Sequence, residues 1–160
     1  MFKKNETILI LDEESHTRWV LQAFLQDEHI STLAVDTIEK AEQHLSRASS
    51  LITEYWIDHQ CALDIVRKLK KRVPGAYVMV LTNEPVKDQS YEEMIKAGVD
   101  DYFLKPISCA KVLLHLQKGL RQRHLIHQKH QLEVELNRIR KRRDGQGGLK
   151  SSMMHKGHAI

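Results

Sequence analysis

The chain has 160 residues, 41% of them hydrophobic, which is enough for one compact domain and a further segment. No apolar run approaches the roughly 18 residues of a membrane span, and residues 1–6 lack the apolar core of a signal peptide. Cys61 and Cys109 are the only cysteines. We therefore expect a soluble cytoplasmic protein that folds without disulfides, and not a membrane or secreted protein.

The formal net charge of +4 conceals an uneven distribution. Residues 1–110 hold 13 Lys and Arg against 18 Asp and Glu, whereas residues 111–160 hold 12 against 3. The pattern indicates an acidic globular part followed by a basic extension.

Five short apolar runs alternate with helical patterns over residues 1–120. The runs predict strands at Ile8–Leu11, Thr32–Val35, Leu51–Glu54, Tyr77–Leu81 and Asp101–Leu104. Ser15 is the expected cap of the first helix, a polar loop follows the third strand, and Gly98 is expected to end the fourth helix. This alternation predicts an α/β fold with a five-stranded parallel sheet, doubly wound by helices.

In such a sheet the carboxyl ends of all strands meet at one edge, where open α/β folds build their sites. Polar side chains follow four of the five predicted strands: Asp12 and Glu13, Glu54, Thr82, and Lys105. The sequence therefore predicts one site that contains an acid pair, a further acid, a hydroxyl and a lysine.

The last helix is predicted to be unusually long, because Gly119 is the only glycine or proline between Ile107 and Arg143. Its second half should project from the domain. Leucine and isoleucine recur there at spacings of 7, 4 and 3, as in a coiled coil, at Leu125, Leu132, Leu136 and Ile139. We predict that residues 121–144 form a coiled-coil helix of a parallel homodimer. Residues 145–160, which lack periodicity, are predicted to be a flexible tail or the remainder of a linker.

Residues 7–120 resemble a response-regulator receiver domain, which has the chemotaxis-regulator-like (flavodoxin-like) fold. Asp12-Glu13 match the magnesium-binding acid pair of that family, Thr82 its hydroxyl, Lys105-Pro106 its lysine and proline, and Tyr102 its switch aromatic. The resemblance implies a module of two-component signal transduction. In this family a histidine kinase phosphorylates an aspartate with the help of Mg²⁺.

The phosphoacceptor position of the family is occupied by Glu54. Its extra methylene moves the carboxylate by about 1–1.5 Å, and a misplacement of that size can cost about a hundredfold in rate. The longer side chain can also pair with Lys105 and accept from Thr82, as a partial mimic of the phosphorylated state. We therefore predict a pseudo-receiver that works without a histidine kinase. A Mg²⁺ site at Asp12, Glu13 and Glu54 stays open.

Several alternatives remain at this stage. Phosphorylation could still occur at Glu54 or at Asp58. The basic run Arg138–Arg143 could bind DNA, although few residues able to read bases accompany it. His124, His127 and His130 could hold a metal instead of being solvated. The prediction that we carry forward is a non-enzymatic, dimeric module that relays a signal to an output domain or protein partner, with neither DNA nor a membrane as partner.

Overall fold

The structure is a computed structural model that describes the backbone of residues 6–153 and the side chains of residues 6–144. The chain divides into two compact units, Met1–Arg123 and His124–Ile160. The helix Cys109–Met153 contains the boundary between them. The described helices include none that is long and apolar enough to cross a lipid bilayer.

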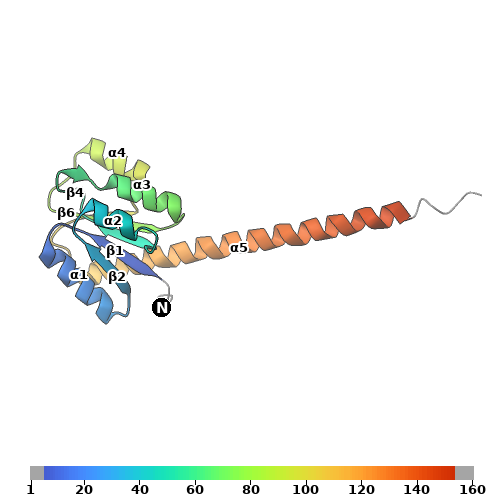
Figure 1. Ribbon diagram of the computed structural model, residues 1–160, viewed down its shortest axis with the longest axis horizontal. Coiled ribbons are helices and arrows are strands. Elements are labelled where there is room, and N and C mark those ends of the chain that lie inside the picture. The colour runs from blue at the N-terminus through green and yellow to red at the C-terminus, as the bar shows by residue number, and fades with distance from the viewer. Residues whose placement is uncertain (1–5, 154–160) are drawn as a thin grey trace, which may run out of the picture. The chain divides into compact units, whose positions relative to one another are not determined.

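The first unit is built on a five-stranded parallel sheet (Figure 1). Its strands are β1 (Thr7–Leu11), β2 (Ser31–Val35), β3 (Ser50–Thr53), β6 (Tyr77–Thr82) and β7 (Asp101–Leu104), in the order β2-β1-β3-β6-β7. Strand bounds differ from the predicted ones by no more than one residue at either end. The predicted α/β fold is thus confirmed.

Five helices cover the two faces of the sheet: α1 (Ser15–Asp27), α2 (Ile38–His44), α3 (Leu63–Arg72), α4 (Asp88–Ala97) and α5 (Cys109–Met153). Alternate residues of each strand serve opposite faces. Leu9 and Leu11 of β1 join one core cluster with α2, α3 and α4, while Ile8 and Ile10 join another with α1 and the start of α5. Both faces are covered, which explains why the strands have continuous apolar sequences.

Two helix ends can be compared with the predictions. Gly98 follows α4 with a φ of 94°, a left-handed conformation that favours glycine, so the predicted end is confirmed. The predicted cap of α1 is wrong, because Ser15 is already helical and Glu14 holds the cap position. Asp12 accepts a hydrogen bond from the Glu14 amide at 2.9 Å, and the site residue therefore also organises the start of the helix.

A small antiparallel hairpin occupies the segment that was predicted as a polar loop. It consists of β4 (Trp56–Ile57) and β5 (Gln60–Cys61). Its two-residue turn has positive φ at both positions, 45° at Asp58 and 61° at His59. Such a turn matches the twist of the flanking strands and normally favours glycine or asparagine. The hairpin places Trp56 beside the carboxyl edge of the sheet.

The helix α5 extends farther than expected. It continues to Met153, so residues 145–153 of the segment predicted as a flexible tail or linker remainder are helical. Residues 154–160 of that tail lie outside the described residues. In the second unit the side chains of the predicted dimer seam are more than half exposed: Leu125, Leu132, Leu136 and Ile139.

Gly119 allows α5 to lie close against the sheet. A Cβ atom at this position would be 2.0 Å from Cδ2 of the Tyr77 ring, which is buried in β6. We expect Gly119→Ala to lower the free energy of unfolding by about 2 kcal/mol, because overpacking outweighs the better helix propensity of alanine. Urea denaturation measures the change. Lys118→Ala is the matched control, since Lys118 is exposed on the same turn, and an equal loss in both variants would contradict this explanation.

Candidate functional site

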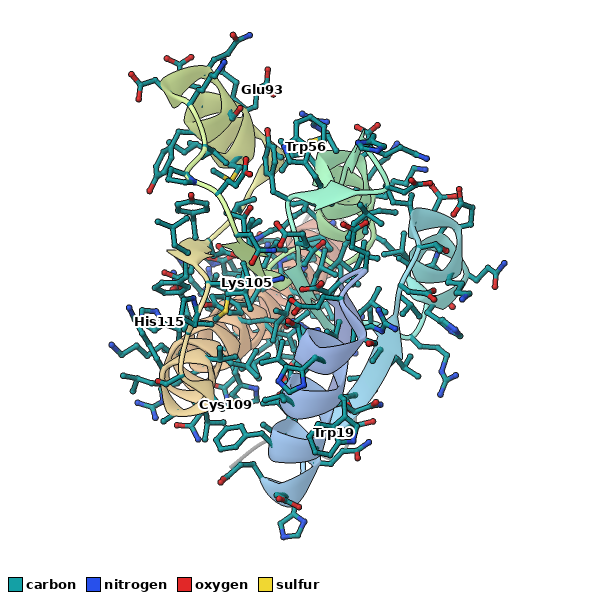
Figure 2. All side chains as sticks on the ribbon, turned by 90° about the vertical axis from the view of Figure 1, so that its left-hand side faces the viewer. Trp19, Trp56, Glu93, Lys105, Cys109 and His115 are labelled. Atoms are coloured by element: carbon teal, nitrogen blue, oxygen red, sulfur yellow. The ribbon has the colours of Figure 1, made fainter. Side chains whose placement is uncertain are left out.

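Three of the predicted site residues are in contact at the carboxyl edge of the sheet. The Lys105 ammonium lies 2.7 Å from Asp12 Oδ2 and 2.9 Å from Glu54 Oε2. The three side chains are at least nine-tenths buried, with exposures of 9% for Lys105, 4% for Asp12 and 8% for Glu54. Lys105 is labelled near the centre of this edge in Figure 2.

The order of the strands brings these residues together. Asp12 and Glu54 directly follow the neighbouring strands β1 and β3, and the Glu54 amide donates to the Leu11 carbonyl at 2.9 Å. Lys105 directly follows β7, and its amide donates to the Thr82 carbonyl at the end of β6, at 2.8 Å. The Lys105–Pro106 peptide bond is cis. The lysine side chain thus reaches across β6 to the two carboxylates.

One ammonium contacts two buried carboxylates, and the pKa values of Asp12 and Lys105 are both raised, for different reasons. Burial raises the pKa of Asp12 above its usual value, although hydrogen bonds from Lys105 and from the Glu14 amide act against the rise. Burial acts to lower the pKa of Lys105, but the contacts with Asp12 and Glu54 outweigh it and raise this pKa. The lysine charge is fully compensated, whereas each carboxylate has only a share of one cation.

The two oxygens of the Glu54 carboxylate have different partners. Oε1 accepts from the Tyr55 amide at 2.8 Å. Oε2 is fully buried and lies against the Lys105 ammonium, although the contact lacks the angles of a hydrogen bond. The expected pairing with Lys105 is present. Among the described residues, however, no hydrogen bond joins Glu54 to the Thr82 hydroxyl, so this expected contact is absent.

Glu13 does not join the other two acids at Lys105. Its Oε2 accepts from the Asp58 amide at 3.0 Å and so supports the turn of the hairpin. Arg18 fixes the same loop, because its guanidinium donates to the Asp12 carbonyl at 2.6 Å and to the Glu13 carbonyl at 2.9 Å. No pattern in the sequence singled out Arg18, which lies on α1 directly after three polar residues.

Tyr102, the predicted switch residue, contacts the loop after β6 and helix α4. It is partly buried against the core, its hydroxyl accepts from the Val86 amide at 3.3 Å, and its ring meets Tyr91 edge-on at 5.5 Å. These contacts hold Tyr102 between the loop after β6 and helix α4.

An acidic cleft of about 680 Å³ opens above the ion pair. Its walls contain Asp12, Glu13, Glu14, Glu54, Trp56, His59, Thr82, Asn83 and Glu84. Trp56 is 52% exposed and was not among the predicted site residues, because its exposure depends on the hairpin. The cleft combines five carboxylates with an exposed aromatic ring.

The acidic side chains are not arranged as a preformed set of three metal ligands. Mg²⁺ takes oxygen ligands in near-octahedral geometry at about 2.0–2.1 Å. Within the described residues, no group of three or more His, Cys, Asp or Glu side chains is placed to hold a metal ion. This applies to Asp12, Glu13 and Glu54, and also to the alternative histidine site on α5.

A doubly wound parallel sheet with buried carboxylates and a lysine at its carboxyl edge defines a receiver-type signalling domain. The family model of the response regulator receiver domain matches residues 8–117, and the chain belongs to this family of two-component signalling modules. Receiver domains are generally non-enzymatic and typically bind Mg²⁺ at their phosphorylation site.

Similar proteins support the assignment. Two-component response regulator ORR7 of Oryza sativa is 26% identical over 113 residues, which are 66% of this chain and 52% of that protein. The alginate biosynthesis transcriptional regulatory protein AlgB of Pseudomonas putida is 28% identical over 149 residues, 92% of this chain and 32% of that protein. The chain thus spans about half of the first relative and about a third of the second. A CheY-like receiver domain protein of Methanospirillum hungatei shares the fold, with a TM-score of 0.69 at 16% identity over 74% of this chain and 96% of that one.

Proposed function

We propose that this chain is an atypical receiver module that signals without being phosphorylated. The observation that carries the proposal is the ion pair between Glu54 and Lys105, at 2.9 Å in a buried site. Glu54 stands at the phosphoacceptor position, and its carboxylate is already engaged by the lysine and by the Tyr55 amide. An attacking carboxylate must be free and accurately placed, and Glu54 is neither.

The proposed output is carried by α5 and by no chemical reaction. The helix begins four residues after Lys105 and continues into the second unit, where its apolar seam is exposed. We propose that the seam forms a homodimer and that the helix relays a signal to an output domain or a protein partner. The match to AlgB supports this relay, because it extends past residue 117 and that protein is named a transcriptional regulatory protein. Both cysteines are free, which agrees with a cytoplasmic location.

The decisive experiment treats the wild type and Glu54→Asp with an acyl phosphate and Mg²⁺. We expect the intact mass of the wild type to stay unchanged, while Glu54→Asp gains one phosphoryl group, because the shorter carboxylate restores the family nucleophile. Sedimentation on the same samples should show that the dimer affinity of the wild type does not respond to the donor.

A mass gain in the wild type would contradict the proposal. Asp58→Asn then distinguishes the two acceptors: a gain that disappears in this variant would assign phosphorylation to Asp58, and a gain that persists would assign it to Glu54. Asp58 is exposed at the turn of the hairpin, so its replacement leaves the buried ion pair in place.

A further inference from the structure

We infer that the Lys105 ammonium replaces the divalent cation of this pocket, so that the protein does not bind Mg²⁺ at its receiver site. The inference deepens the proposed function and rests on it, because it concerns the same pocket. It can still fail separately, since a receiver may bind Mg²⁺ and remain unphosphorylated.

The oxygens that a cation would need are already in contact with positively polarised groups of the chain. Asp12 Oδ1 accepts from the Glu14 amide at 2.9 Å, and Oδ2 accepts from Lys105 at 2.7 Å. Glu54 Oε1 accepts from the Tyr55 amide at 2.8 Å, and Oε2 lies 2.9 Å from the same ammonium. Three of the four carboxylate oxygens of the two buried acids therefore accept hydrogen bonds, and the fourth, Glu54 Oε2, is in ion-pair contact with the ammonium without hydrogen-bond geometry.

The third acid is directed elsewhere. Glu13 adjoins Asp12 in the sequence, yet its carboxylate accepts from the Asp58 amide at 3.0 Å and supports the hairpin turn. The acid pair is divided: Asp12 belongs to the ion pair and Glu13 to the hairpin. A cation at Asp12 and Glu54 would thus also lack its third carboxylate.

The position of the ammonium excludes a metal ion that uses the same oxygens. Lys105 Nζ lies within 2.9 Å of both Asp12 Oδ2 and Glu54 Oε2, so an ion bound to both would occupy the space of the ammonium. Mg²⁺ gives up its water reluctantly. The lysine belongs to the same chain and therefore acts at a high effective concentration. The Lys105 ammonium is therefore favoured over Mg²⁺ from solution as the cation bound to these two carboxylates.

The test measures Mg²⁺ binding by calorimetry and by the emission of Trp56, which lines the cleft. Trp19 is 68% exposed on α1, so all proteins carry Trp19→Phe and only Trp56 reports. With millimolar MgCl₂ we expect neither binding heat nor a change in emission for the otherwise wild-type protein. We expect Lys105→Gln to bind Mg²⁺ saturably, at least about tenfold more tightly than the upper limit that the wild-type data set, because two buried carboxylates lose their cation.

Lys70→Gln is the matched control. It also removes an ammonium 2.7 Å from a carboxylate, that of Asp100, but outside the cleft, and it should bind no Mg²⁺. If Lys105→Gln does not fold, Glu54→Asp provides the second route, because its shorter side chain withdraws one oxygen from Lys105 and should also gain Mg²⁺ binding.

Saturable binding by the wild-type pocket, abolished by Asp12→Asn, would overturn the inference. Folded Lys105→Gln or Glu54→Asp proteins that bind no more Mg²⁺ than Lys70→Gln would overturn it as well, because the lysine would then not be what excludes the ion. The two proposals are contradicted by different experimental results. Mg²⁺ binding without phosphoryl transfer contradicts only this inference, and a mass gain of the wild type with acyl phosphate contradicts the proposed function.

Discussion

Replacement of Lys105 by methionine is expected to lower the free energy of unfolding by about 3–5 kcal/mol at neutral pH, as when one partner of a buried ion pair is removed. Methionine keeps most of the length of the side chain, so the loss of the ammonium dominates. Asp12 and Glu54, both more than nine-tenths buried, would be left without a counter-charge. Chemical denaturation of the two proteins measures the difference.

The loss of unfolding free energy in Lys105→Met should become smaller as the pH falls. Burial already raises the pKa of Asp12, and loss of Lys105 raises this pKa further. A carboxyl group with a raised folded-state pKa contributes stability below its unfolded pKa and loses it as the pH rises through the folded value. Lys105→Met should therefore recover part of its stability relative to the wild type as the pH falls from neutral to about 4.

Lys70→Met is the control for this prediction. Its ion pair with Asp100 is partly exposed, with side-chain exposures of 22% and 41%, so we expect a loss of no more than about 1 kcal/mol. An equal deficit of Lys105→Met at neutral and acidic pH would show that the lysine stabilises through packing and not through its charge.

The parts of the fold that could be predicted are those that depend on local patterns. β1 and β6 are buried on both faces, so their sequences are continuous apolar runs, and each run ends where a polar site residue begins. Because all strands are parallel, the convergence of Asp12, Glu54 and Lys105 followed from topology alone. The predicted contact between Lys105 and Glu54 needs only that convergence and opposite charges.

The hairpin and the role of Glu13 could not be predicted, because they depend on each other over a long distance in the chain. The turn has positive φ at Asp58 and His59, neither of which is glycine, and it is supported by the Glu13 carboxylate, 45 residues away. No local pattern contains that contact. The close fit of Gly119 on Tyr77 is similar: the sequence showed a glycine in a helix but not the ring that requires it.

The second large effect is expected at the proposed dimer seam of Leu125, Leu132, Leu136 and Ile139. We expect Leu132→Ser/Leu136→Ser to weaken dimerisation by about a thousandfold or more. The double change removes four leucines from each dimer, and each fully buried leucine contributes about 1.5–3 kcal/mol. These side chains are 65% and 53% exposed in the single chain, so the fold of the protomer should be unaffected. Sedimentation equilibrium measures the dissociation constant, and circular dichroism verifies the fold.

Val134→Ser is the matched control, because Val134 is also exposed on α5 but lies about 200° around the helix from Leu132. It should leave the dissociation constant nearly unchanged. A wild type that remains monomeric at high concentration, or equal dissociation of the control, would contradict the assignment of the seam.

The charges beside the seam predict the orientation of the two helices. If Leu132 and Ile139 take d positions and Leu136 an a position, Glu135 falls at g and Arg140 at the next e. In a parallel dimer these two residues pair between the helices, whereas an antiparallel arrangement brings e positions to e and g to g. Glu135→Arg should thus weaken a parallel dimer, and the further change Arg140→Glu should restore it. Failure of the double change to restore affinity would exclude the parallel register, because the exchange leaves both the apolar seam and the net charge of the wild type in place.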